Sequence, residues 1–262
     1  FGSSRSGLPL LGMGTCSTST RGAALPQSPP PGAEQAVDDA EQQQQELPGR
    51  GAAQSSQVIR LAGVLTDSEI EQVKAVSAKV AAQPRKNHPL RSGWATRYLH
   101  ADGVFQQELP HLRKKLIDAA LAADSSGGGC HLLPRVHARG RLAPRVIEHH
   151  LVTSGGSLAD QQHYDQGSLV TIDVMLSDPG IDFEGGAFTT PEGPGEFQTH
   201  SFSRRGDALV FVSHKCHFIR PVITGCREVL VMELWEGAER TCDHRCNQNW
   251  GLCSFASTGS SS

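Results

Sequence analysis

Apolar positions recur with two different periods along this chain, helical in the first half and strand-like in the second. Thr66-Asp67-Ser68-Glu69 has the Ser/Thr-x-x-Glu spacing of a capping box, which marks the start of a helix. After it, apolar residues recur at helical spacing until Pro84 ends the run: Ile70, Val73, Val76 and Val80. A second helix is predicted over residues 110–123, before the Ser- and Gly-rich residues 125–129.

The predicted strands are short and lie mostly after residue 145. Two come early, at residues 58–61 and 94–100. The others are separated by Gly, Pro and Asp; they cover residues 146–152, 168–176, which are rich in β-branched residues, 197–202, and the strongly apolar residues 208–212 and 229–234. Two helices followed by five or more short strands predict an α+β fold whose strands form a sandwich or barrel.

The first 57 residues differ from the rest in composition. They contain Ser-, Pro- and Gln-rich runs without apolar periodicity, so we expect residues 1–57 to be disordered and dispensable for chemistry. Residues 1–31 carry two arginines and no acid. This composition is weakly typical of a transit peptide, and it also fits a disordered linker. The chain starts with Phe, so we expect an upstream piece to be missing, and the localisation stays open.

The remaining composition narrows the function. A net charge of −3 without a dense Lys/Arg run argues against a nucleic-acid surface. The chain has no stretch of 18 apolar residues, so no membrane span is predicted. The oligomeric state stays open. Seven cysteines form no dense framework, but Cys242, Cys246 and Cys253 cluster late, with His244 between them. The sequence favours a local disulfide with one spare thiol there over a small zinc knot.

Three residues near the middle of the chain have the ligand types of a non-haem iron site. His163 and Asp165 are two apart, so on one strand both side chains would point the same way. His217 follows 54 residues after His163, and Arg227 lies ten residues further on. Two imidazoles and one carboxylate on one face of an octahedral metal are the usual ligands of non-haem Fe(II) oxygenases.

Two similar patterns are weaker candidates for metal ligands. A second H-x-D, His100-Ala101-Asp102, has no cation ten residues after its candidate partners and is interpreted as a strand end running into a turn at Gly103. His214 lies close to His217, but only His217 has the Pro-Val and Arg residues that follow at the required spacing.

Four motifs occur in the order found in one known family. They are His163-Tyr-Asp165, Phe183-Glu-Gly-Gly-Ala-Phe188, Arg205-Gly-Asp-Ala-Leu-Val-Phe211 and His217-x3-Pro221-Val-x2-Gly225-x-Arg227. Together they resemble the 2-oxoglutarate/Fe(II)-dependent dioxygenases, most of all the prolyl 4-hydroxylase-like branch. The resemblance is strong over residues 145–235 and extends more loosely back to Val58. We therefore expect a dioxygenase domain over 58–240, with a Cys-containing tail at 241–262.

The resemblance implies a double-stranded β-helix (jelly-roll) core flanked by the N-terminal helices. It also implies hydroxylation of a C–H bond in a peptide, possibly prolyl, or a small molecule, with O2 as oxidant, ascorbate as reductant, and release of succinate and CO2. In that reading His163, Asp165 and His217 bind Fe(II), and Arg227 pairs with the distal carboxylate of 2-oxoglutarate, to which a guanidinium offers a planar fork of donors. Thr189 and His149 stand nearest to the positions of two further co-substrate contacts.

Two other functions remain as alternatives. One is a jelly-roll binding module that keeps the fold and has lost turnover. The other is a demethylase of alkylated nucleic-acid bases in the same superfamily. The pattern typical of these demethylases has arginines well beyond the distal histidine. Position 234, seventeen residues past His217, is Leu234 here, and no basic surface is predicted, so the sequence disfavours the demethylase.

Overall fold

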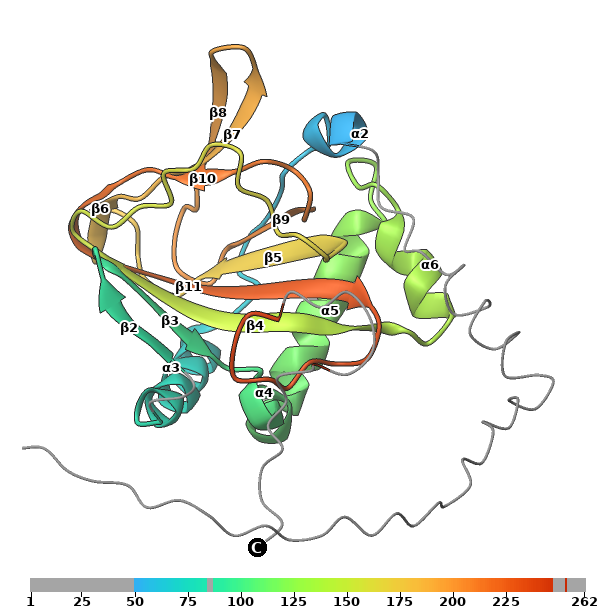
Figure 1. Ribbon diagram of the computed structural model, residues 1–262, viewed down its shortest axis with the longest axis horizontal. Coiled ribbons are helices and arrows are strands. Elements are labelled where there is room, and N and C mark those ends of the chain that lie inside the picture. The colour runs from blue at the N-terminus through green and yellow to red at the C-terminus, as the bar shows by residue number, and fades with distance from the viewer. Residues whose placement is uncertain (1–49, 84–86, 247–252, 254–262) are drawn as a thin grey trace, which may run out of the picture. The chain divides into compact units, whose positions relative to one another are not determined.

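A computed structural model describes residues 50–83, 87–246 and 253 of the chain (Figure 1). The helices are α2 (Arg50–Gln54), α3 (Asp67–Ala81), the short 3-10 helix η2 (Ala101–Gly103), α4 (Val104–Glu108), α5 (Pro110–Asp124) and α6 (Leu132–Ala138). The strands are β1 (Ile59–Leu61), β2 (Asn87–Arg91), β3 (Trp94–Tyr98), β4 (Leu142–Thr153), β5 (Val170–Met175), β6 (Phe183–Gly185), β7 (Phe188–Gly193), β8 (Glu196–His200), β9 (Ala208–Val212), β10 (Phe218–Ile219) and β11 (Val222–Glu236).

The strands form two sheets built from antiparallel pairs. The larger has the order β1-β9-β5-β11-β4-β3-β2, and β6 pairs with the first part of β11. The smaller has the order β10-β7-β8, and the β7–β8 hairpin projects away from the large sheet (Figure 1). Two long strands, β4 and β11, pair over most of their length at the centre of the large sheet. The α+β prediction is therefore confirmed.

Helices α3 and α5 pack on the large sheet and form the main hydrophobic core with it. Buried residues on these helices, Ile70, Val73, Leu112 and Leu116, join one apolar cluster with residues of β5, β9 and β11. The predicted capping box of α3 is present, since the Glu69 amide donates to Thr66 Oγ1 at 3.3 Å and the Thr66 amide donates to Glu69 Oε2 at 2.8 Å. No helix among the described residues is long and apolar enough to cross a membrane.

The segment expected to be disordered, residues 1–57, contains an ordered part. Helix α2 lies within it, and the side chain of Ala53 is fully buried. The Cys216 amide donates to Gln54 Oε1 at 3.0 Å, Lys215 Nζ donates to the Gln54 carbonyl at 2.5 Å, and Gln54 Nε2 donates to the Pro191 carbonyl. The folded part thus begins by Arg50 rather than at Val58. Composition missed it because five residues are too few to show a period.

We expect Gln54 to support the loop that carries His217. Gln54→Ala removes two side-chain hydrogen bonds, one from the Cys216 amide of this loop and one to the Pro191 carbonyl on β7, at about 0.5–1.5 kcal/mol each. The free energy of unfolding should therefore fall by about 1–3 kcal/mol in denaturant titrations, and a chain that begins at Gln57 should bind metal more weakly than one that begins at Gln45. Gln198→Ala, at an exposed position on β8, is the matched control. Equal stability of the two variants would show that the Gln54 contacts are unimportant.

Candidate metal and co-substrate site

The three predicted metal ligands lie on two loops that backbone hydrogen bonds hold together. His163 and Asp165 lie before β5, and His217 lies directly before β10. The His217 amide donates to the His163 carbonyl at 2.9 Å, and the Asp165 amide donates to the Ser213 carbonyl at 2.8 Å. The expectation that His163 and Asp165 share one strand is wrong, because their segment pairs through these loop contacts and not through a strand ladder.

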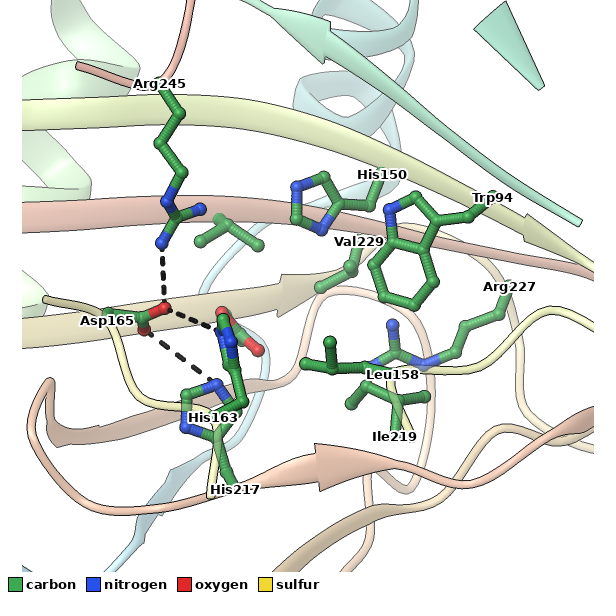
Figure 2. Close-up of a pocket in the computed structure, with 12 residues that line it drawn as sticks. Trp94, His150, Leu158, His163, Asp165, His217, Ile219, Arg227, Val229 and Arg245 are labelled. Atoms are coloured by element: carbon green, nitrogen blue, oxygen red, sulfur yellow. Dashed lines mark hydrogen bonds and ion pairs between the residues drawn. The ribbon is translucent and has the colours of Figure 1, made fainter. Parts of the chain in front are cut away.

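The ligand atoms of these residues converge on one point. One nitrogen or oxygen atom from each of His163, Asp165 and His217 lies within 4.8 Å of the other two. His163 Nε2 is 3.4 Å from Asp165 Oδ1, and His217 Nε2 is 4.0 Å from Asp165 Oδ2 (Figure 2). A cation placed between these atoms would meet two imidazoles and one carboxylate from one side.

Neighbouring groups orient the ligands. The carbonyl of Lys215 lies 3.0 Å from His217 Nδ1, so this nitrogen carries the proton and Nε2 is left to face Asp165. Thr171 Oγ1 donates to Asp165 Oδ2 at 2.7 Å. The ring of Phe188 stacks on His217 with 5.2 Å between centroids and 13° between planes. These contacts fix both side chains before any metal arrives.

The charges at the site suit a cation. Burial alone would raise the pKa of the Asp165 carboxyl, but His217, His163 and Arg245 together lower it well below its usual range. Burial lowers the pKa of His217, and Asp165 only partly opposes this. The site therefore presents an ionised carboxylate and a neutral imidazole, the protonation states in which both bind metals.

Arg227 extends into the same cavity from β11. Its side chain is 1% exposed, and its Nε and Nη2 atoms have no hydrogen-bond partner among the described residues. The cavity is also lined by His163, Asp165 and His217, and apolar side chains, Leu158 and Ile219, lie beside the guanidinium (Figure 2). Burial lowers the pKa of Arg227 to about 10, an effect that the nearby Asp173 opposes, so the group stays charged at neutral pH. A buried cation with unsatisfied donors is suited to binding an anion.

The Gly-Gly pair makes room for this arginine. Gly186 has a φ of +61°, and a Cβ at this position would come within 2.8 Å of Arg227 Cδ. At Gly185, with a φ of +80°, a Cβ would lie 2.5 Å from the Pro221 carbonyl oxygen. Only glycine combines these backbone conformations with such close approach. The motif is therefore a packing requirement of the cavity wall.

The two further co-substrate candidates do not reach the cavity. Side chains alternate along β4, so His150 lines the cavity while His149 points to α3, where its Nδ1 lies 2.6 Å from Ser77 Oγ. On β7 the same alternation gives Phe188 the position against His217, and the buried Thr189 is not among the described residues that line the cavity. Both predictions placed the residue one position away from the inward-facing side chain.

An unpredicted arginine from the tail reaches the metal ligands. Arg245 Nη2 donates to Asp165 Oδ1 at 2.9 Å (Figure 2). The same nitrogen also donates to Glu233, and Nη1 donates to Glu148 Oε2 at 3.2 Å. Burial alone would raise the pKa of Glu148, but Arg245 helps to lower it to about 2. The only sequence signal was the arginine's place between His244 and Cys246, which spacing rules do not connect to His163.

Two more buried carboxyls surround the site. Burial, followed by the charge of Asp165, raises the pKa of Asp173 to about 8. Burial also raises the pKa of Glu233 to about 7, although Arg245 opposes this. These acids lie on β5 and β11, where an apolar pattern predicted core strands, so periodicity could not separate them from ordinary core positions.

The second H-x-D has a structural role. β3 ends at Tyr98, and η2 begins at Ala101, which agrees with the predicted strand end and turn. His100 is buried, and its two ring nitrogens lie 2.9 Å from the Ile147 carbonyl oxygen and 3.2 Å from that of His244. This histidine therefore ties the tail to β4.

Searches by sequence find no relative: no model of a protein family matches the chain, and no curated protein does. Solved structures do match. The α-ketoglutarate-dependent epimerase SnoN from nogalamycin biosynthesis superposes with a TM-score of 0.52 at 15% identity, over 71% of this chain and 81% of SnoN. This likeness shows the fold, a jelly-roll core with helices, and confirms the predicted fold class.

Other matching structures are also 2-oxoglutarate/Fe(II) oxygenases, and they include prolyl hydroxylases. One is a Trichoplax adhaerens prolyl hydroxylase in complex with a hypoxia-inducible-factor peptide, with a TM-score of 0.49 and 13% identity over 71% of this chain and 87% of that one. Another is a Pseudomonas putida prolyl-4-hydroxylase, with a TM-score of 0.47 and 14% identity over 72% of this chain and 97% of that one.

Proposed function

We propose that this protein is an Fe(II)- and 2-oxoglutarate-dependent dioxygenase that hydroxylates a C–H bond of a peptidyl or small-molecule substrate. The observation that carries the proposal is one cavity that holds both a His/Asp/His cluster and a buried, unsatisfied guanidinium. Either feature alone fits many sites. Together they match the needs of a chelating dianion that binds a metal at one end and a cation at the other.

The residues present fit Fe(II). His163, Asp165 and His217 supply the two-histidine, one-carboxylate set on one side of the ion, which leaves the other coordination positions for co-substrate and O2. When bound, Fe(II) would support oxidative decarboxylation of 2-oxoglutarate by O2 to succinate and CO2, with the second oxygen atom entering the substrate C–H bond. The chain itself orients the ligands through Lys215 and Thr171.

The same cavity fits 2-oxoglutarate. Arg227 can donate two charge-assisted hydrogen bonds to the distal carboxylate, and the apolar side chains of Leu158 and Ile219 line the cavity beside it. The protonated carboxyl of Asp173, whose pKa is raised to about 8, would not repel that carboxylate at neutral pH. The half-buried His163 lies toward the open side, where substrate would enter.

The demethylase alternative gains no support from the fold. Leu234 stands where the pattern typical of those enzymes has arginine, and it is fully buried in the hydrophobic core. The binding-module alternative retains the same site and differs only in lacking turnover.

The test is succinate formation from 2-oxoglutarate with Fe(II), ascorbate and air. We expect slow succinate release without substrate and a faster release with the right member of a panel of prolyl peptides, other peptides and small metabolites. Mass spectrometry should then find a gain of one oxygen atom in that substrate. Tight binding of Fe(II) and 2-oxoglutarate without any succinate would favour the binding module instead.

A further inference from the structure

Three cysteines and one histidine of the tail form a second cluster, away from the cavity. Cys242, Cys246 and Cys253 are buried thiols, and His244 lies among them. The favoured prediction of a local disulfide is therefore wrong for this structure. One ligand atom from each of the four residues lies within 4.8 Å of the other three.

The distances agree with a tetrahedral zinc ion. Bonds of about 2.3 Å to sulfur and about 2.0–2.1 Å to nitrogen place ligand atoms roughly 3.6–3.8 Å apart around Zn²⁺. Cys253 Sγ is 3.4 Å from His244 Nε2. Three thiolates and one imidazole are a closed structural set for this metal, with no position left for a substrate.

The surroundings favour a metal over simple packing. The three cysteines form a cluster of their own, separate from both hydrophobic clusters of the sheets. His244 Nδ1 lies 3.2 Å from Asp243 Oδ1, so the carboxylate can hold the proton on Nδ1 and leave Nε2 to face the sulfurs. A carboxylate behind the second ring nitrogen is the usual outer partner of a zinc-bound histidine. A disulfide would account for none of these histidine contacts.

Arg245 connects this cluster to the cavity that holds His163, Asp165 and His217. In the sequence it lies between two residues of the cluster, His244 and Cys246. The backbone carbonyls on either side of Arg245 also have partners. His100 Nε2 lies near the His244 carbonyl, and Arg145 donates to the Cys246 carbonyl. The short segment His244–Cys246 is thus fixed at its backbone, and its middle side chain extends to a metal ligand.

We propose that Cys242, His244, Cys246 and Cys253 bind one structural Zn²⁺, which positions Arg245 against Asp165. The ion stabilises the turn that presents the guanidinium, and the guanidinium holds the Asp165 carboxylate in place by donating to its Oδ1. Arg245 is in this account a positioning residue, because it acts on the metal through Asp165.

Cobalt substitution tests the zinc site on the full chain. Metal-free protein titrated with Co²⁺ without oxygen should develop thiolate-to-cobalt absorption that saturates at about one ion per chain. The His163→Ala/Asp165→Ala double variant should retain this absorption, because its remaining site supplies the thiolates. Zinc analysis of protein purified without chelators should likewise find about one tightly bound zinc per chain in that variant.

Two cysteine variants and one control complete the test. Cys253→Ser and Cys242→Ser should weaken metal binding at this site by more than the roughly 10- to 100-fold that loss of an outer partner causes. Cys130→Ser, outside the cluster, should leave it unchanged. Arg245→Ala should keep the zinc yet weaken Fe(II) binding, whereas Arg139→Ala should keep both. Absence of thiolate-to-cobalt absorption in the wild-type protein, or absorption equally strong in Cys253→Ser, would overturn the proposal.

Discussion

Replacing Arg227 with Ala should weaken 2-oxoglutarate binding by roughly 30- to several-thousand-fold. The guanidinium is buried, and two of its nitrogens have no hydrogen-bond partner among the described residues. If they bind the distal carboxylate, their removal leaves that anion unpaired in a partly desolvated cavity, which costs on the order of 2–5 kcal/mol. Fe(II) binding should stay nearly unchanged, because Arg227 is not one of the converging ligands.

Two further variants sharpen this prediction. Arg227→Lys should restore part of the affinity, since it returns the charge without the planar fork. Arg139→Ala, at an exposed arginine, should bind 2-oxoglutarate as the wild type does. Calorimetric titration of each protein with 2-oxoglutarate in the presence of Mn²⁺, a redox-stable substitute for Fe(II), measures the affinities directly. Unchanged affinity in Arg227→Ala would remove this residue from the site.

Replacing His163 or Asp165 with Ala should abolish succinate formation. Each change removes one of three ligands from a site whose other positions are needed for 2-oxoglutarate and O2. The His163 side chain is 31% exposed, so His163→Ala should fold normally, with an unchanged circular dichroism spectrum and thermal transition. Asp165→Ala also removes the partner of Arg245 and Thr171 and should lower stability as well as activity.

His214→Ala is the matched control for these variants. His214 lies three residues before His217, and its ring packs on Tyr164 at 5.2 Å instead of lining the cavity. Turnover should persist in His214→Ala at near wild-type levels. If His163→Ala retained full turnover while His214→Ala lost it, the ligand assignment would be wrong.

The sequence predicted well those features that depend on local period or on ordered motifs. The apolar spacing and capping box of residues 66–80 correspond to α3, and the apolar run at 208–212 coincides with β9. Metal ligands could be chosen because four spaced motifs restrict the choice to few histidines. For the same reason His217 was separated from His214, which the structure keeps outside the cavity.

The direction in which a strand side chain points, and contacts between residues far apart in the sequence, could not be predicted in this way. A shift of one residue reverses the direction of a strand side chain, and this is how His149 and Thr189 were chosen instead of their inward-facing neighbours His150 and Phe188. Arg245 meets Asp165 across 80 residues, and no period connects them. The short elements β6 and β10 were missed because two or three residues show no pattern.

The central claim is that one cavity binds Fe(II) and 2-oxoglutarate together. The most direct test is an anaerobic titration of the metal-free protein with Fe(II) in the presence of 2-oxoglutarate, followed by visible absorption. We expect a metal-to-2-oxoglutarate charge-transfer band that saturates at one Fe(II) per chain and is absent in His163→Ala. A wild-type protein that develops no such band, or a band of equal strength in His163→Ala, would contradict the account.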